Sequence, residues 1–255
     1  MSNYVGIIKK HFRPRVQSLL DDIKQLRDKE FFRPTGTQMY VGQQGSGKTI
    51  SAVKHALDIK ARYPKAIIVS NLRLNYLTSV SLEQYLENGI APLQYIFFQN
   101  MDELADCLTQ VNNGFRGVLY LIDEIHTYFN ALDSKNIPMF VFTEISQQRK
   151  QRKCIVATSQ LFMRTAKPFR EQCDNVIECK TIFGFITFTI AYDGAALSLE
   201  GEEKAKSIHK KRLGWFFHTR KIREAYDTYQ KVVSGAEQYA AQQNVTINSK
   251  KLKIK

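Results

Sequence analysis

The tightest constraint on the fold of this chain is the eight-residue stretch Gly42-Gln43-Gln44-Gly45-Ser46-Gly47-Lys48-Thr49. It matches the pattern G-x-x-x-x-G-K-[ST], in which a loop of small residues wraps a polyphosphate with its backbone N–H groups pointing inward. Residues 37–41 before it are β-prone, and residues 50–61 after it repeat apolar residues at helical spacing. The following helix would therefore present its positive dipole end to the phosphates. The sequence predicts a nucleotide-binding loop between a strand and a helix.

Two residues at the end of this loop have specific expected roles. Lys48 would reach the β- and γ-phosphates as a point charge, and the Thr49 hydroxyl would bind the Mg²⁺ that bridges them. The expected cofactors are ATP and Mg²⁺. The residues expected to bind them are Gly42, Gln43, Gln44, Gly45, Ser46, Gly47, Lys48, Thr49 and Ile50.

Residues 117–124, GVLYLIDE, form an uncharged run that ends in two carboxylates. Such a run is typical of a buried parallel strand, and its carboxyl end lies at the edge of the sheet where ligands bind. Asp123 would hold the magnesium ion through water, and Glu124 would polarise the attacking water. The alternative is a strand that ends in two solvent-facing acids.

Alternating strands and helices elsewhere predict an α/β fold, with a mostly parallel sheet and helices on both of its faces. The expected strands are residues 66–70, 93–99, 117–124 and 154–159, followed by the β-rich runs 175–180 and 185–192. The expected helices are residues 81–88, 102–111 and 138–153, with a helical turn at 169–173.

The 255 residues suffice for one domain with appendages. We expect an amphipathic helix within residues 1–34, the ATPase domain at 35–193, and a basic extension with aromatic residues at 194–255. The β-run 185–192 would complete a hairpin, and residues 234–255 would be a disordered or weakly helical tail.

The formal charge of +13 is concentrated at the two ends of the chain. Residues 1–60 and 181–255 each hold +6, whereas 61–120 hold −1 and 121–180 hold +2. Basic ends suit a polyanion such as nucleic acid, or an anionic membrane surface. Basic residues mixed with aromatics in residues 213–229 could hold a nucleic acid strand, or the aromatics could pack this segment against the domain. A soluble protein with basic tails is the alternative to both.

Four cysteines without a C-x-x-C pair and five histidines predict no zinc or disulfide framework. The first residues lack the apolar stretch of a signal peptide, and the longest apolar run is too short to cross a bilayer. We therefore expect a host cytoplasmic protein, or one associated with a virion.

Gln160 directly follows the expected strand 154–159. Its amide could bond both the γ-phosphate and the lytic water, although such a residue can equally cap a helix or face solvent. Arg149 and Arg152, with Arg164 and Arg170 behind them, are candidates for an arginine supplied to a neighbouring subunit. The alternative for this cluster is the plain basic end of a helix.

Residues 123–126 spell the D-E-x-H box of two-domain helicases, but too little chain follows for a second such domain. The absence of an N-K-x-D signature argues against a GTPase. A ring or filament in which a neighbouring subunit completes the site is therefore expected.

Three segments, IDEIHTYFNAL (122–132), ISQQRKQRK (145–153) and ATSQLFMRTAKPFREQCD (157–174), resemble the zonula occludens toxin family of filamentous-phage assembly proteins. That family lies within the FtsK–HerA superfamily of DNA-pumping ATPases. The resemblance implies a RecA-like P-loop NTPase fold and a hexameric motor. It also implies that Gln160 is the superfamily's strand-end glutamine and that the arginine finger is Arg149 or Arg152.

Phage-extrusion members usually continue into a membrane-spanning helix and a periplasmic part, and this sequence predicts neither. The expected function is thus an ATP-driven motor that translocates or packages viral DNA, with viral DNA and a capsid or portal-vertex protein as partners. One alternative is a virion assembly and export ATPase that reaches a membrane only through a partner. Another is a nucleotide-dependent scaffold that binds DNA or a capsid.

Overall fold

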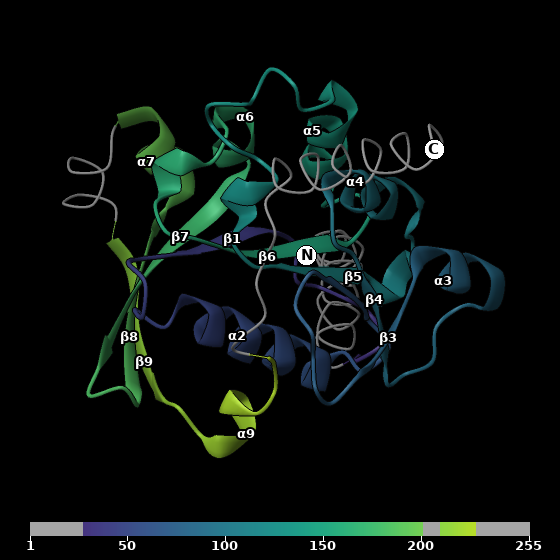
Figure 1. Ribbon diagram of the computed structural model, residues 1–255, viewed down its shortest axis with the longest axis horizontal. Coiled ribbons are helices and arrows are strands. Elements are labelled where there is room, and N and C mark those ends of the chain that lie inside the picture. Colours follow the sequence, from purple (N-terminus) through teal and green to yellow (C-terminus); the bar gives the residue numbers. More distant parts are fainter. Residues whose placement is uncertain (1–27, 201–209, 228–255) are drawn as a thin grey trace, which may run out of the picture.

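The computed structural model describes residues 28–200 and 210–227, and a single mixed sheet forms the middle of the part it describes (Figure 1). The strands are β1 Gly36–Val41, β2 Ile67–Ser70, β3 Thr78–Val80, β4 Gln94–Phe97, β5 Val118–Ile122, β6 Lys153–Ser159, β7 Cys173–Ile182, β8 Ile186–Asp193 and β9 Lys210–Phe217. Their order is β3-β4-β2-β5-β6-β1-β7-β8-β9. Strands β3, β4, β2, β5, β6, β1 and β7 run parallel to one another. Strands β8 and β9 then extend the sheet with antiparallel pairing.

Helices cover both faces of the sheet (Figure 1). They are α2 Lys48–Arg62, α3 Leu82–Asn88, α4 Met101–Gln110, α5 Met139–Ser146, α6 Lys167–Arg170, α7 Gly194–Glu200 and α9 Arg220–Arg223, with short 3₁₀ turns η1 Gly114–Arg116, η2 Ile125–Thr127 and η3 Phe162–Arg164. Helices α4 to α7 pack on one face, and α2 and α9 lie on the other. The predicted α/β fold, with a mostly parallel sheet and helices on both faces, is confirmed.

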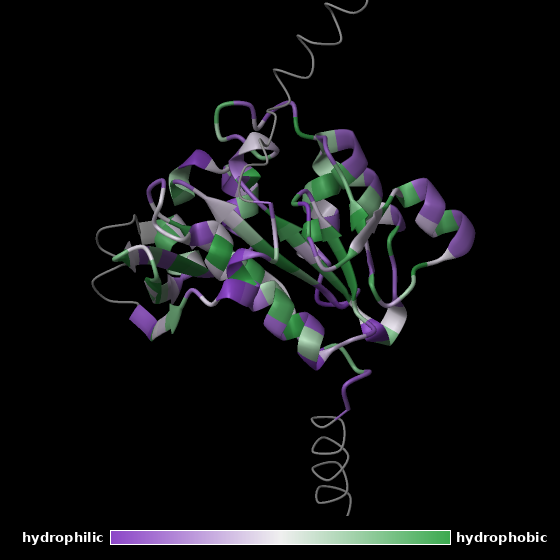
Figure 2. Ribbon diagram, turned by 60° about the horizontal axis from the view of Figure 1, so that its bottom comes forward, coloured by the Kyte–Doolittle hydropathy of each residue, from purple (hydrophilic) through white to green (hydrophobic). Residues whose placement is uncertain are grey.

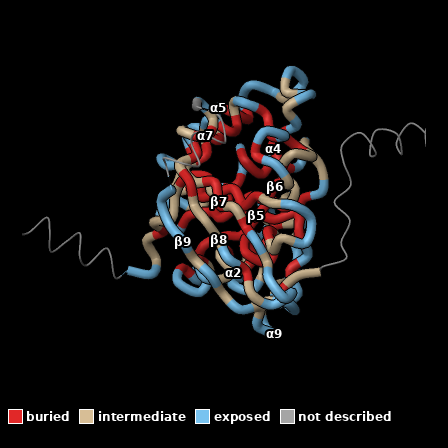
Figure 3. Tube along the Cα trace, turned by 90° about the vertical axis from the view of Figure 1, so that its left-hand side faces the viewer, coloured by how far each residue is buried: buried red, intermediate tan, exposed pale blue. Residues whose placement is uncertain are grey.

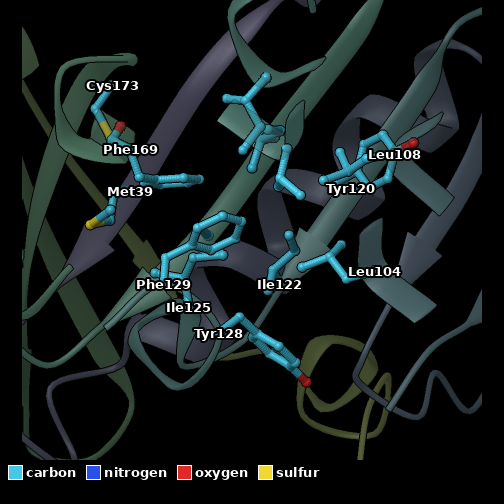
Figure 4. Close-up of a cluster of buried hydrophobic side chains, with 14 of the residues drawn as sticks. Met39, Leu104, Leu108, Tyr120, Ile122, Ile125, Tyr128, Phe129, Phe169 and Cys173 are labelled. Carbon is cyan, nitrogen blue, oxygen red and sulfur yellow. The ribbon is translucent and has the colours of Figure 1, made fainter. Parts of the chain in front are cut away.

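Each central strand contributes to two separate cores because successive side chains point to opposite faces. In β5, Tyr120 joins the core beneath α4 and α5, whereas Leu119 and Leu121 join the core beneath α2. Figure 4 shows the first core, where Tyr120 lies beside Leu104 and Leu108 of α4. The buried strands appear as the hydrophobic centre in Figure 2 and as the red centre in Figure 3. Burial on both faces explains the continuous apolar runs in the sequence.

A local sequence signal correctly predicted the start of helix α3. Ser81 caps α3: its side chain accepts from Gln84 N, and the Gln84 side chain accepts from Ser81 N. The four cysteines are free and buried, as expected of packed thiols. Among the described residues, no helix has the length and apolar character needed to cross a membrane.

The helix expected over residues 138–153 is wrong in its second half. Helix α5 ends at Ser146, residues 147–152 form turns, and Lys153 already belongs to β6. The backbone of Val118 donates to Arg152 O at 3.0 Å, and that of Lys153 donates to Gln148 O at 2.8 Å. Alignment with β5 therefore overrides the helix-forming tendency of this polar stretch.

Further elements differ from the expectation, including helices α7 and α9, which were not predicted. Most of the helix expected within residues 1–34 lies outside the described residues, and residues 28–34 are not helical. Strand β3 was missed because it has only three residues. Strand β9 was missed because its alternation is hidden among basic residues, KKRLGWFF.

Candidate functional site

The loop of residues 42–47 joins β1 to α2, as the motif predicts. Gly47 has φ 87°, and a Cβ atom there would lie 2.4 Å from Thr181 Oγ1 and 2.5 Å from Thr187 Oγ1. Only glycine fits this backbone conformation beside β7 and β8. Gln43, Gln44 and Gly45 form the exposed crest of the loop. The loop is thus held from behind and open to solvent in front.

The two polar side chains that begin α2 both point into the site. Lys48 is only 6% exposed, and its Nζ donates to Gln43 O at 3.2 Å. The Thr49 hydroxyl donates to Asp123 Oδ1 at 2.9 Å. The site residues Lys48, Thr49 and Asp123 therefore meet, although Asp123 follows a different strand.

Asp123 is buried and held by two hydroxyls. Thr158 Oγ1 donates to the same Oδ1 atom at 2.7 Å. Burial raises the pKa of Asp123, while the hydrogen bonds from Thr158 and Thr49 and the charge of Lys48 oppose that rise. A hydroxyl and a carboxylate oxygen are the ligands that Mg²⁺ prefers, so Thr49 and Asp123 fit this ion.

Glu124 occupies a strained backbone conformation directly after β5. Its φ is 49° and its ψ 53°, in the left-handed region, where its N–H donates to Thr158 Oγ1 at 2.9 Å. Its Oε2 is buried without a hydrogen bond from any described residue, although His126 Nδ1 lies 3.2 Å away. Burial, then the neighbouring Asp123, raises the pKa of Glu124, while Lys48 and Arg164 lower it. A buried carboxylate oxygen without a hydrogen-bond partner calls for an explanation, and a bound water is one.

Gln160 directly follows β6, which lies between β1 and β5 in the sheet. Its carbonyl oxygen accepts from Gly42 N at 3.3 Å, so it adjoins the phosphate loop. Arg164 Nη1 donates to Gln160 Oε1 at 2.9 Å. Burial and then the charge of Arg164 lower the pKa of His126, and the same charge opposes the rise in the pKa of Glu124. Arg164 therefore belongs to this site, whereas the sequence ranked it behind two other arginines.

Those two arginines are not brought to the site within one chain. Arg149 and Arg152 precede β6, at the opposite edge of the sheet from the phosphate loop. Arg149 Nη2 pairs with Asp174 Oδ1 at 2.9 Å. Arg152 donates to Phe32 O at 3.0 Å and lies over the Phe31 ring.

Three candidate residues remain, and each lies near the phosphate loop or the turn that contains Arg164. They are Arg170, Ser46 and Ile50. Arg170 is buried and donates to Met163 O at 3.1 Å, so it braces the turn that contains Arg164. Ser46 Oγ is buried without a hydrogen-bond partner in the described structure. Ile50 is buried in the first turn of α2, where it lines a cavity.

Asn71 and Thr158 are site residues that the sequence analysis missed. Asn71 follows β2, and its side chain accepts from Asp123 N at 2.8 Å and donates to Asp123 O at 2.9 Å. Thr158 bonds both acidic residues. The available signal was a polar residue at the carboxyl end of each neighbouring apolar strand, AIIVSN and CIVATS, because these ends meet at one edge.

Replacing Asn71 by Ala should destabilise the protein and lower its hydrolytic turnover together. The substitution leaves two buried backbone groups of Asp123 unpaired, which costs about 1–3 kcal/mol for each group. Urea unfolding and steady-state phosphate release measure the two effects. Asn88→Ala, at an exposed position ending α3, is the matched control. Unchanged stability in Asn71→Ala would show that the two hydrogen bonds from Asn71 to the Asp123 backbone do not stabilise the protein.

Two cavities border the phosphate loop. One, of about 570 Å³, lies on the α7 side and is lined by apolar residues together with Gln43, Gln160, Glu178 and Lys180. The other, of about 380 Å³, contains Lys48 and Thr49 and reaches residues after β9. Both volumes lie in the range of small-molecule sites.

Comparisons with known proteins support this description. A family model described as zonular occludens toxin (Zot) matches residues 37–192. Among proteins with curated descriptions, none matches the sequence.

Several solved structures share the architecture. The genome packaging NTPase B204 of Sulfolobus turreted icosahedral virus 2, in complex with AMPPCP, has a TM-score of 0.51 at 12% identity, covering 73% of this chain and 98% of that one. A second solved structure, described as an ATPase domain, has a TM-score of 0.50 at 10% identity, covering 86% and 98%. The N-terminal domain of zonular occludens toxin from Neisseria meningitidis has a TM-score of 0.49 at 12% identity, covering 76% and 100%. The first two establish a RecA-like NTPase fold.

Proposed function

This chain belongs to the zonular occludens toxin family, and from that premise we propose that it is an ATPase that moves viral DNA during genome packaging. The observation that supports hydrolysis most directly is the meeting of Lys48, Thr49, Asp123 and Glu124 at one edge of the sheet. A binding scaffold needs the first three, but it does not need a second, half-buried carboxylate beside them.

We assign each part of the proposed reaction to particular residues of this chain. Lys48 binds the β- and γ-phosphates, and the loop amides bind the rest of the polyphosphate. Thr49 and Asp123 hold Mg²⁺, which supplies positive charge to the phosphates. Glu124 accepts a hydrogen bond from the attacking water and polarises it. Gln160, whose side-chain oxygen accepts from Arg164, supplies the amide that bonds both that water and the γ-phosphate.

Charge and exposed aromatic rings support nucleic acid as the partner. Trp215 is 62% exposed and Phe183 84% exposed, and the Phe185 and Phe217 rings stack at 6.3 Å. Strand β9 begins with Lys210, Lys211 and Arg212, and it is largely exposed in Figure 3. Basic residues beside aromatic rings hold nucleic acid strands by charge and base stacking. Phe216, in contrast, faces Lys54 of α2, so part of this segment packs on the domain.

We further propose that the motor acts as a ring, with a hexamer as the expected form and a capsid or portal-vertex protein as its docking partner. Arg149 and Arg152 lie away from the loop of their own chain, so any role as a finger would be toward a neighbour. Mixing Arg149→Ala or Arg152→Ala subunits with Lys48→Ala subunits would restore some hydrolysis if either arginine acts in this way.

DNA should stimulate ATP hydrolysis by the full chain. The measurement is phosphate release with single-stranded DNA, double-stranded DNA or no DNA, repeated at rising salt because phosphate contacts weaken with ionic strength. No response to any nucleic acid would contradict the motor and favour the alternative of a nucleotide-dependent scaffold. Stimulation only by membranes bearing a partner would favour the export ATPase.

A further inference from the structure

The segment 218–227, here called the strap, follows β9 and crosses the face of the sheet that α2 covers. At its start, His218 N donates to Phe185 O at 2.7 Å. At its end, Asn75 N donates to Ala225 O at 2.9 Å and Asp227 N donates to Arg73 O at 3.1 Å, which ties the strap to the loop after β2. Ala225 is buried in the α2 core. Figure 1 shows α9, within the strap, on the α2 side of the sheet.

A row of hydroxyl groups connects the strap to the phosphate loop. Thr181 Oγ1 donates to Ser46 O at 2.9 Å and lies 2.7 Å from Thr187 Oγ1. Thr187 Oγ1 lies 2.6 Å from His218 Nε2. Thr187 is fully buried, so these bonds form inside the protein. The strap is therefore positioned relative to the loop by direct contacts.

The strap and the phosphate loop line one cavity of about 380 Å³. Lys48, Thr49 and Ile50 come from the start of α2, and His218, Arg223 and Tyr226 come from the strap. Among the described residues that line this cavity, Lys48 and Arg223 are positively charged and none carries a carboxylate. Arg223 Nη2 donates to Gly184 O at 2.7 Å, which fixes the guanidinium at the cavity wall. This cavity is suited to an anion.

The order of the strands indicates which part of a nucleotide would occupy the cavity. Asp123 and Glu124 follow β5, on one side of β1, so the γ-phosphate end lies toward β5. The rest of the nucleotide must leave toward β7, on the other side of β1. Thr181 and Gly184, from β7 and the turn after it, line this cavity. The larger cavity contains the carboxylate of Glu178 and neither Lys48 nor Thr49, and so suits a phosphate less well.

We propose that the strap forms the α-phosphate and ribose subsite of the nucleotide pocket, with Arg223 bonding the α-phosphate from the same chain. This inference rests on the proposed binding of ATP at the loop. Arg223 holds the end of the polyphosphate that Lys48 does not reach, and His218 and Tyr226 border the sugar and base. Nucleotide binding thereby becomes linked to the docking of β9 and the strap on α2.

Equilibrium binding of fluorescently labelled ATP and ADP to the full chain tests this subsite. Because both nucleotides carry the α-phosphate, Arg223→Ala should weaken both by about 10-fold, as expected for one charge-assisted hydrogen bond. Arg223→Lys, which keeps the charge, should recover part of the loss. Arg220→Ala is the matched control, since Arg220 lies in the same helix, is 90% exposed and pairs with Glu224. Thermal unfolding of each variant checks that the strap remains docked.

Two outcomes would overturn the subsite. Weaker binding of ATP alone would place Arg223 at the γ-phosphate, and unchanged binding of both nucleotides would remove it from the pocket. Lys48→Ala distinguishes this failure from failure of the proposed function. If Lys48→Ala weakens binding and Arg223→Ala does not, only the subsite is wrong. If neither variant weakens binding, the loop itself is not the nucleotide site.

Discussion

Replacing Glu124 by Gln is expected to lower the rate of ATP hydrolysis by about 10²–10⁴-fold, the usual contribution of a positioned general base. The amide is nearly isosteric with the carboxylate but is a much weaker proton acceptor. In the wild type, burial and Asp123 raise the pKa of Glu124, which makes it a stronger base than an exposed glutamate. Single-turnover phosphate release at saturating ATP measures the chemical step.

Nucleotide affinity must stay near the wild-type value for this interpretation to hold. Glu124 takes no part in the hydrogen bond of 2.9 Å between the Thr49 hydroxyl and Asp123. Its replacement should therefore leave these two residues in place. Glu83→Gln, exposed in the first turn of α3, is the matched control and should leave turnover unchanged. Wild-type turnover in Glu124→Gln would show that another group activates the water.

Replacing Lys48 by Ala is expected to lower turnover by about 10²–10³-fold, as for the loss of one preorganised hydrogen-bond donor to a reacting group. It should also weaken ATP binding by about 10-fold or more, because a charged hydrogen bond is lost. Lys48 is buried and points back over the loop to Gln43 O. Calorimetric titration with ATP and steady-state kinetics measure the two effects.

Lys65→Ala is the control for this substitution. Lys65 follows the same helix, is exposed and pairs at the surface with Glu30, a contact worth about 0–1 kcal/mol. Its loss should change neither ATP affinity nor turnover. If Lys48→Ala also behaves like the wild type, the glycine-rich loop does not bind phosphate in this protein.

The central fold could be predicted from the sequence because its strands are buried on both faces. Runs such as VLYLI of β5 and CIVATS of β6 contain no charge, and flanking polar residues marked their ends. The short β3 and the basic β9 lack that signal, since exposed strands need no continuous apolar run. The end of α5 was missed because pairing of β6 with β5 is a tertiary effect.

Much of the candidate site could also be predicted, because the motif fixes which residues face a phosphate. The residues that hold Asp123 in place could not be predicted. Asn71 and Thr158 are ordinary polar residues in the sequence, and only the strand order places them beside Asp123. Arg164 was ranked below Arg149 and Arg152 because sequence distance does not reveal which edge of the sheet a residue occupies. The structure assigns those edges through strand direction.

The neighbours of β1 in the sheet have a consequence for biosynthesis. Gly36 of β1 pairs with Cys154 of β6, and Thr37 pairs with Cys173 of β7. As the chain leaves the ribosome, the glycine-rich loop emerges early, yet the strands that flank β1 are made much later. Such long-range pairing is slow, because loop closure comes before any contact compensates for it. The proposed nucleotide site therefore stays incomplete until β7 has been synthesised, and binding of ATP there would stabilise only a chain whose sheet is already assembled.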